Sequence, residues 1–205
     1  MKEKPATVFV VDDDEAVRTS LRLLLKSVGL PVETFESATT FLEQYDGNRA
    51  GCLVLDIRMP GMSGLDLQLA LNERHSILPI VFITGHGDVP MAVEAMQAGA
   101  VDFIQKPFRD QDLIDRINRG LTKDGEMREA LRARDDIRVR ISELTPRERE
   151  VLDLVTAGKA NKVIAGDLNV SQRTVEIHRA RVMEKMNANS LAHLVRMVIE
   201  AQRED

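Results

Sequence analysis

An alternation of short apolar runs with helical patterns is the feature that most limits how the first 122 residues can fold. The runs TVFVV (7–11), CLVLDI (52–57) and PIVFIT (79–84) are nearly continuous in apolar residues, and weaker runs lie at 32–35 and 101–104. Strands buried on both faces have this composition, because helices cover both sides of a parallel sheet. We therefore predict a doubly wound α/β domain with a five-stranded parallel sheet, of the flavodoxin-like kind.

The helices of this domain follow from the spacing of apolar residues between the strands. Val17, Leu21, Leu24 and Val28 recur every three or four positions, and Gly29 then suits the end of a helix. Four more helices are expected over 38–45, 64–74, 88–98 and the segment from Leu113 to Leu121. The sequence contains no GxGxxG and no Walker-type loop, so no motif supports nucleotide binding.

Residues 142–205 have only helical periods and predict a small all-α domain of four helices. Thr145 and Glu148 have the spacing of a capping box, which begins a helix. Ser171 caps the third helix, and a tight turn joins that helix to a short second one at 161–168. Two helices across such a turn are typical of a helix-turn-helix domain.

A charge-dense segment lies between these two domains. Its sequence DGEMREALRARDDIRVR has thin apolar spacing, which favours a solvated helical linker. A short dimerising helix is the alternative. The predicted organisation is a first domain at 1–122, a helical linker at 123–141 and a helix-turn-helix domain at 142–205.

Charge and cysteine content limit the class of protein. The formal net charge is −5, and the acid excess lies in residues 1–122, which hold 18 Asp+Glu against 12 Lys+Arg. Because residues 142–205 are balanced, any nucleic-acid binding must use a local basic patch. The single cysteine, Cys52, excludes a disulfide framework and fits a reducing compartment. No apolar segment reaches membrane-spanning length, and we expect a cytoplasmic protein without a membrane partner.

Acidic, hydroxyl and amino side chains follow the strands at the edge where a parallel sheet binds ligands. Asp12 and Asp13 end the first strand, Asp56 ends the third, Thr84 ends the fourth, and Lys106 follows the fifth. Converging carboxylates repel one another unless a cation lies among them, and Mg²⁺ prefers oxygen ligands while keeping positions open for water and phosphate. Asp56 can then attack phosphorus to give an aspartyl phosphate, with Thr84 and Lys106 binding the phosphoryl oxygens.

Three runs in the first domain and one in the second resemble a known family. The runs DIRMPGMSG (56–64), FITGHGDVPMAVEAM (82–96) and AGAVDFIQKPF (98–108) resemble the receiver domain of two-component response regulators, in particular the FixJ subfamily. The run NKVIAGDLNVSQRTVEIHRARVMEKM (161–186) resembles the LuxR-type helix-turn-helix domain of the same regulators. Together with the order of the two domains, the resemblance covers nearly the whole chain.

This resemblance implies roles for the residues at the strand ends. Asp56 would be the phospho-acceptor, and the Mg²⁺ ligands would be Asp12, Asp13, Asp56 and the backbone carbonyl of Arg58. Thr84 and Phe103 would form the switch pair, in which Thr84 moves to the phosphate and Phe103 turns inward behind it. Phenylalanine at position 103 departs from the commonest receiver pattern, where tyrosine is frequent.

Other parts of the receiver also gain an expectation from the resemblance. The peptide bond between Lys106 and Pro107 would be cis, which X-Pro bonds tolerate. Arg58 and His86 would tune the lifetime of the phosphate. The apolar helix 89–99 would belong to a face that pairs two receivers into a homodimer after phosphorylation.

The helix after Ser171 is the expected recognition helix for the major groove of DNA. Val175, Val182 and Met186 share one face and should lie in the core. On the opposite face Arg173 or Arg181 suits guanine, Glu176 suits cytosine, and Ile177 or Ala180 suits a thymine methyl group. The predicted DNA-binding residues are Lys162, Arg173, Thr174, Glu176, Ile177, Arg179, Ala180, Arg181 and Lys185.

These features predict a transcriptional activator and not an enzyme. A sensor histidine kinase would transfer a phosphoryl group to Asp56, the receiver would dimerise, and the second domain would bind promoter DNA for RNA polymerase. If the FixJ resemblance extends to the pathway, the kinase is an oxygen-sensing haem protein and the targets are nitrogen-fixation or microaerobic genes. The alternatives are a FixJ-like regulator of another pathway, a magnesium-dependent aspartyl-phosphate phosphatase, and a constitutive DNA-binding protein with a vestigial receiver.

Overall fold

The computed structural model describes residues 5–85 and 89–202. The chain divides into two compact units, Met1–Arg128 and Glu129–Asp205, and each is described by itself. His86, which was predicted to influence phosphate lifetime, lies outside the described residues.

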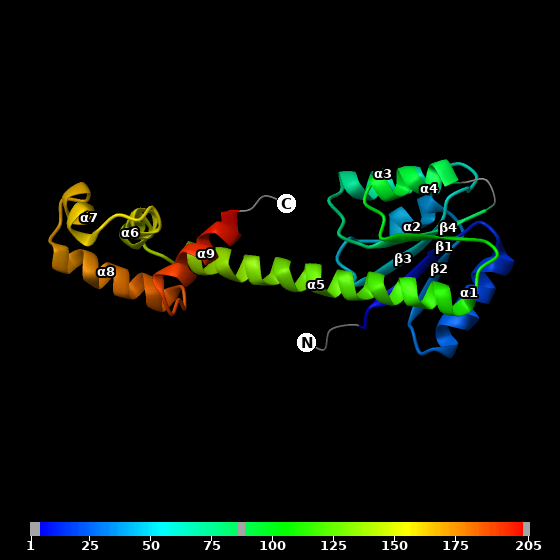
Figure 1. The fold of residues 1–205 in the computed structure, drawn as a ribbon, viewed down its shortest axis with the longest axis horizontal. Coiled ribbons are helices and arrows are strands. Elements are labelled where there is room, and N and C mark those ends of the chain that lie inside the picture. The colour runs from blue at the N-terminus through cyan, green and yellow to red at the C-terminus, as the bar shows by residue number, and fades with distance from the viewer. Residues whose placement is uncertain (1–4, 86–88, 203–205) are drawn as a thin grey trace. The chain divides into compact units, whose positions relative to one another are not determined.

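The first unit contains a five-stranded parallel sheet, which confirms the predicted fold class (Figure 1). The strand order is β2-β1-β3-β4-β5, so the chain winds outward from β1 in both directions. The strands are β1 (Thr7–Val11), β2 (Val32–Phe35), β3 (Gly51–Asp56), β4 (Ile80–Thr84) and β5 (Asp102–Gln105).

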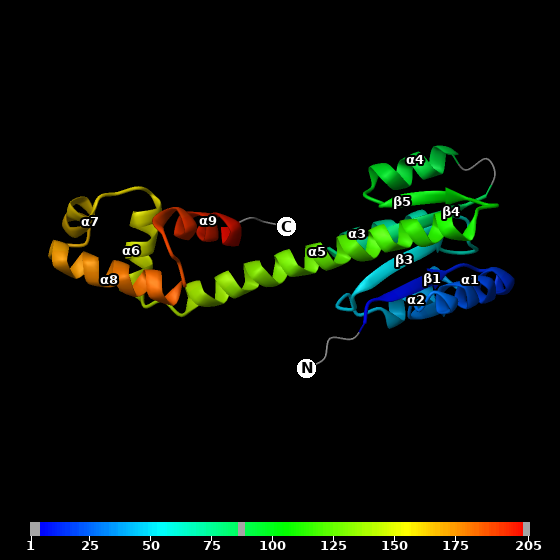
Figure 2. The same cartoon turned by 60° about the horizontal axis from the view of Figure 1, so that its bottom comes forward.

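Helices cover both faces of this sheet, as Figure 1 and Figure 2 show. They are α1 (Glu15–Ser27), α2 (Ala38–Gln44), α3 (Gly64–Glu73), α4 (Val89–Gln97) and α5 (Asp110–Ser142). Successive strand residues point to opposite faces. Phe9 and Leu53 pack in one core cluster with α2, α3 and α4, whereas Val8 and Cys52 pack in a second cluster with α1 and α5. This double burial explains the near-continuous apolar runs of the strands.

Short loops hold the ends of β1 and β3 in place. The side chain of Asp14 caps α1 by accepting a hydrogen bond from the backbone N–H of Ala16. Ser63 and Asp66 form a capping box at the beginning of α3. Gly64 allows that helix to start against β3, because a Cβ atom at this position would overlap the backbone carbonyl oxygen of Asp56. Because β1 and β3 pair in parallel, the loops after them lie beside each other.

The second unit contains four helices after α5, as predicted: α6 (Pro146–Thr156), α7 (Asn161–Asp167), α8 (Gln172–Lys185) and α9 (Leu191–Gln202). The expected capping box of Thr145 and Glu148 begins α6, and Ser171 caps α8. Val175, Val182 and Met186 are fully buried in the core of this unit, as expected from the helical spacing.

Helix α5 is longer than the sequence suggested. It runs without interruption from Asp110 to Ser142, so the predicted last helix of the receiver and the predicted linker form one helix of 33 residues. The first compact unit extends along it to Arg128, six residues beyond residue 122. Asp124, inside the supposedly solvated segment, is only 1% exposed.

Candidate functional site

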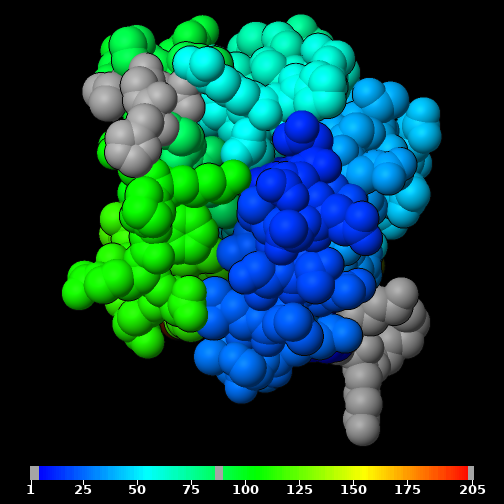
Figure 3. Space-filling view, turned by 90° about the vertical axis from the view of Figure 1, so that its right-hand side faces the viewer, coloured from blue at the N-terminus to red at the C-terminus, as the bar shows by residue number. Residues whose placement is uncertain are grey.

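Four polar side chains gather at the carboxyl ends of the strands. Asp12 follows β1, Asp56 ends β3, Thr84 ends β4, and Lys106 follows β5. Figure 3 shows the face where the segments after β1 (blue), β3 (cyan) and β5 (green) meet. The peptide bond between Lys106 and Pro107 is cis, as the resemblance implied, and the Lys106 N–H donates to the carbonyl oxygen of Thr84 at 2.7 Å.

Lys106 bridges two carboxylates that come from neighbouring strands. Its Nζ atom lies 3.0 Å from Oδ2 of Asp12 and 2.8 Å from Oδ1 of Asp56. The other oxygen of Asp56 accepts a hydrogen bond from the backbone N–H of Arg58 at 2.7 Å. Oδ1 of Asp12 accepts from the backbone N–H of Asp14 at 2.9 Å. Both carboxylates are therefore oriented by their surroundings.

Burial and charge act in opposite directions on Asp56. Removal from water raises the pKa of its carboxyl group, and the nearby Asp12 raises it further, while the hydrogen bond from Lys106 lowers it. The outcome is a raised pKa. Burial lowers the pKa of Lys106, but its bonds to Asp56 and Asp12 outweigh this effect and raise the pKa. The site thus holds a relatively basic carboxylate beside a stable cation.

The arrangement of oxygen atoms fits a hard divalent cation. Asp12 and Asp56 are two buried carboxylates on adjacent strands that already share one positive charge, the ammonium group of Lys106. Asp13 is exposed next to them. Among residues 5–85 and 89–202, no three His, Cys, Asp or Glu side chains form a metal-binding group by themselves. Mg²⁺ needs only one or two carboxylates, because carbonyl oxygens and waters complete its octahedron.

Thr84 and Phe103 lie on neighbouring strands. Thr84 is buried at the end of β4, whereas Phe103 on β5 is 38% exposed. The register pairs Thr84 with Gln105, so Phe103 lies two residues earlier on the same side of the sheet. The side chain of Arg58 is exposed near Asp56.

Helix α8 presents most of the predicted DNA-binding residues to solvent. Arg173, Glu176, Ile177, Ala180 and Arg181 are exposed on it, as is Lys162 on α7. Arg173 and Glu176 lie 3.6 Å apart as an ion pair on this surface.

Three predicted DNA-binding residues also have partners inside the domain. Thr174 contacts the capping residue Ser171, with 2.8 Å between the two hydroxyl oxygens. The guanidinium group of Arg179 donates to Oδ1 of Asn161 at 3.0 Å and so joins α8 to α7. Nζ of Lys185 lies 2.7 Å from Oε2 of Glu148.

The sequence identified Glu148 only as a helix cap. In the structure its carboxylate is buried, and the hydrogen bond from Lys185 followed by the one from the backbone of Thr145 lowers its pKa to about 2. Because Lys185 is 37 residues away in sequence, no local pattern could have revealed this pair.

Among the residues that the structure describes, no helix is long and apolar enough to span a lipid bilayer.

Comparisons with known proteins find a separate family match for each of the two domains. The family described as "Response regulator receiver domain" matches residues 8–118, and the family "Bacterial regulatory proteins, luxR family" matches residues 142–198. The transcriptional regulatory protein FixJ of Rhizobium meliloti (strain 1021) is 51% identical over 197 residues, which cover 94% of this chain and 95% of that protein.

Two further proteins are similar over most of their length. Nodulation protein W of Bradyrhizobium diazoefficiens is 48% identical over 192 residues, which cover 94% of this chain and 85% of that protein. A solved structure described as a low-resolution structure of the response regulator StyR is 51% identical, with a TM-score of 0.84. The matched region covers 95% of this chain and 98% of the StyR chain.

Proposed function

The chain belongs to the two-component response regulators that join a receiver to a LuxR-type DNA-binding domain, and we propose that Asp56 is the phospho-acceptor that controls its binding to promoter DNA. A sensor kinase and DNA are the partners of such a regulator. Members of this family are DNA-binding transcription regulators and not phosphatases.

The bridge from Lys106 to Asp12 and Asp56 is the observation that carries the proposal. It presents the Asp56 carboxylate, with its raised pKa, beside a cation at the carboxyl end of β3. A carboxylate oxygen of Asp56 forms the new P–O bond while the P–N bond to the kinase histidine breaks and its electron pair returns to the imidazole. Lys106 then binds a phosphoryl oxygen.

Bound Mg²⁺ would neutralise charge on the incoming phosphoryl group. Its ligands would be Asp12, Asp13, Asp56 and the backbone carbonyl of Arg58. The support for this assignment is the oxygen donor set and the two buried carboxylates, whose two negative charges share only the single positive charge of Lys106.

After phosphorylation, Thr84 and Phe103 act as the switch and two receivers pair. Thr84 moves toward the phosphate, and the exposed ring of Phe103 turns inward. The face formed by α4, β5 and the first turns of α5 is the pairing surface. Val93, Met96 and Phe103 are exposed apolar side chains on this face, which supports a contact with a second copy.

The paired second domains then bind a promoter through α8 and act on RNA polymerase. The groove-facing set is Arg173, Thr174, Glu176, Ile177, Ala180 and Arg181, and the phosphate-contacting set is Lys162, Arg179 and Lys185. Two modules on one site supply the affinity that a module with balanced charge lacks. The domain limits that we propose are 1–122, 123–141 and 142–205.

The most specific part of the proposal is the pathway, that is, the target genes and the kinase. Extending the FixJ resemblance to the pathway gives a cytoplasmic regulator of nitrogen-fixation or microaerobic genes with an oxygen-sensing haem kinase, and the identity to FixJ and to nodulation protein W supports this extension for nitrogen fixation. Regulation of another pathway is the alternative.

Sedimentation with Mg²⁺ and acetyl phosphate tests the central claim. Wild-type protein is expected to gain one phosphoryl group by intact mass and to form dimers, while Asp56→Asn does neither. Phosphate on Asp56→Asn, or none on the wild type, would contradict the assignment of Asp56. A phosphorylated protein that stays monomeric would contradict the dimerisation step alone.

A further inference from the structure

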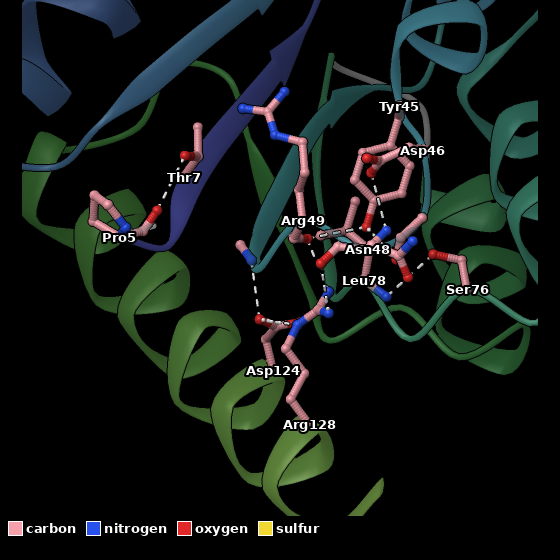
Figure 4. Close-up of polar contacts among 12 residues, drawn as sticks. Pro5, Thr7, Tyr45, Asp46, Asn48, Arg49, Ser76, Leu78, Asp124 and Arg128 are labelled. Atoms are coloured by element: carbon pink, nitrogen blue, oxygen red, sulfur yellow. Dashed lines mark hydrogen bonds and ion pairs between the residues drawn. The ribbon is translucent and has the colours of Figure 1, made fainter. Parts of the chain in front are cut away.

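A buried ion pair ties helix α5 to the end of the sheet opposite the phosphorylation site (Figure 4). Oδ2 of Asp124 accepts a hydrogen bond from the backbone N–H of Gly51, the first residue of β3, at 2.9 Å. Nε of Arg128, one turn further along α5, donates to both oxygens of Asp124 at 3.0 and 2.9 Å. Asp124 therefore joins the strand and the helix through a single carboxylate.

Arg128 extends this connection to the loop before β3. Its two terminal nitrogens donate to the carbonyl oxygens of Asn48 at 3.1 Å and Arg49 at 2.8 Å. The hydroxyl group of Tyr45 also donates to the Arg49 carbonyl at 3.2 Å. In Figure 4 the Asp124 carboxylate and the carbonyl groups of Asn48 and Arg49 lie around the guanidinium group of Arg128. We call the pair Asp124 and Arg128, with their bonds to residues 48–51, the α5 latch.

Helix α5 lies very close to β3 just before the latch. A Cβ atom added to Gly120 would lie 2.6 Å from Sγ of Cys52, so only glycine fits between helix and strand here. A Cβ atom at Gly51 would overlap the backbone of Thr7. Gly120 thus permits the close approach of α5 to β3 that brings the Asp124 carboxylate to the Gly51 N–H, while Gly51 allows the start of β3 to pack against β1.

A second helical glycine has no such steric reason. Gly125 lies next to Asp124, and a Cβ atom there would have no atom within 4 Å. Glycine is the poorest helix former after proline, because its backbone loses the most freedom on folding. Gly120 and Gly125 therefore weaken α5 over residues 120–125, immediately before and at the beginning of the latch.

We propose that residues 120–125 are a hinge in α5 and that the Asp124–Arg128 latch holds this hinge in its continuous, docked form. The inference goes beyond the proposed function and, for its signalling role, rests on it. β3 begins at the latch and ends at Asp56, and α5 continues past Arg128 into the second unit. A docked α5 transmits changes in the receiver to the segment after Arg128, and a loose hinge absorbs them.

Hydrogen exchange of the full-length protein tests the latch without phosphorylation. Arg128→Gln and Asp124→Asn are expected to lose at least tenfold in amide protection over residues 120–130. The matched controls Lys123→Gln and Glu126→Gln, both exposed on α5, are expected to stay within twofold of the wild type. Adding Gly125→Ala to Arg128→Gln should restore much of the protection, because alanine stiffens the helix.

Two exchange results would overturn the latch. Unchanged protection over 120–130 in both latch variants would show that the pair does not hold the helix. An equal loss of protection in β1, β4 and α5 would show that the pair supports the whole receiver and no local hinge exists.

DNA binding tests the signalling role, with a duplex selected from a random library by phosphorylated wild-type protein. The gain in affinity on treatment with acetyl phosphate is expected to fall at least fivefold in Arg128→Gln and to return with Gly125→Ala. Phosphate incorporation by intact mass should stay within twofold of the wild type. A full gain in Arg128→Gln despite lost protection would overturn the signalling role. No gain in the wild type would count against the proposed function, while exchange would still decide the latch.

Discussion

Lys106 is the residue on which both the stability and the chemistry of the receiver site depend. Its ammonium group compensates the buried Asp12 and Asp56, so its removal leaves two carboxylates side by side. Because Lys106 is about a third exposed, water screens part of this effect. We expect Lys106→Gln to lower the free energy of unfolding by about 1–2 kcal/mol in urea titrations.

The same substitution should slow phosphorylation from acetyl phosphate by about 10- to 100-fold, the worth of one charge-assisted hydrogen bond. Lys26→Gln, on the exposed end of α1, is the control and should change neither quantity. Phosphorylation of Lys106→Gln at the wild-type rate would show that the ammonium group does not bind the transferred group.

Glu148 gives the second domain a defined response to acid. Its pKa falls from 4.5 to about 2 on folding, so the carboxylate contributes its full stability above pH 4.5 and loses it as the pH falls toward 2. We expect Glu148→Gln to be about 1–2 kcal/mol less stable than the wild type at pH 7. The difference should shrink as the pH falls from 4.5 toward 2 in urea titrations.

Glu150→Gln is the matched control for this pH series. Glu150 pairs with Arg147 on the surface of the same helix, where such pairs contribute little to stability. Its stability difference from the wild type should stay small at every pH. A constant difference for Glu148→Gln between pH 7 and pH 3 would contradict the linkage to its lowered pKa.

A comparison of variants at Arg179 and Arg181 distinguishes the loss of a DNA contact from the loss of packing inside the domain. Arg181 is exposed, so Arg181→Ala should weaken binding to a selected duplex about tenfold or more and leave stability unchanged. Arg179 also bonds to Asn161, so Arg179→Ala should cost about 1 kcal/mol of stability in addition. Equal stability of the two variants would show that the Arg179–Asn161 bond is dispensable.

At the scale of elements, the β3–α3 turn controls where Asp56 lies. A Cβ atom at position 64 overlaps the Asp56 carbonyl, so Gly64→Ala must displace the strand end or the helix. We expect a loss of about 1–3 kcal/mol in urea titrations and slower phosphorylation. Gly166→Ala, in α7 where the added Cβ meets nothing, should instead stabilise the protein by about 0.5–1 kcal/mol.

Local patterns predicted the strands, the capped helices and the core face of α8, because burial on both faces and cap chemistry leave periodic signals. They did not predict the length of α5. A buried acid such as Asp124 looks solvated until the strand that meets it is known, and Gly51 lies 73 residues earlier. For the same reason the ion pair of Glu148 and Lys185 was not predicted, because its two residues are 37 positions apart.

For the whole molecule, the two units do not share a hydrophobic core, which predicts two thermal transitions. Leu53 lies in a core of the first unit and Val175 in that of the second, so Leu53→Ala and Val175→Ala should each lower one transition. Mg²⁺ should shift to higher temperature only the transition that Leu53→Ala lowers, because at 100 times its Kd it adds about 2.7 kcal/mol to the free energy of unfolding of that unit.

Asp12→Asn is the control for this calorimetric experiment, since it removes one proposed Mg²⁺ ligand. Its receiver transition should not respond to Mg²⁺. An effect of Mg²⁺ on the transition that Val175→Ala lowers would place a metal site in the second unit and contradict the proposal.

The buried thiol of Cys52 gives the protein a built-in chemical probe of the contact between α5 and β3. Burial raises the pKa of its thiol to about 12, and the side chain is fully enclosed beneath α5. Alkylating reagents attack thiolates, so they can reach this sulfur only while the helix is lifted from the strand. The alkylation rate of Cys52 therefore measures how often α5 separates from β3. It can be compared in the unphosphorylated protein and in the protein that carries phosphate on Asp56, without any added label.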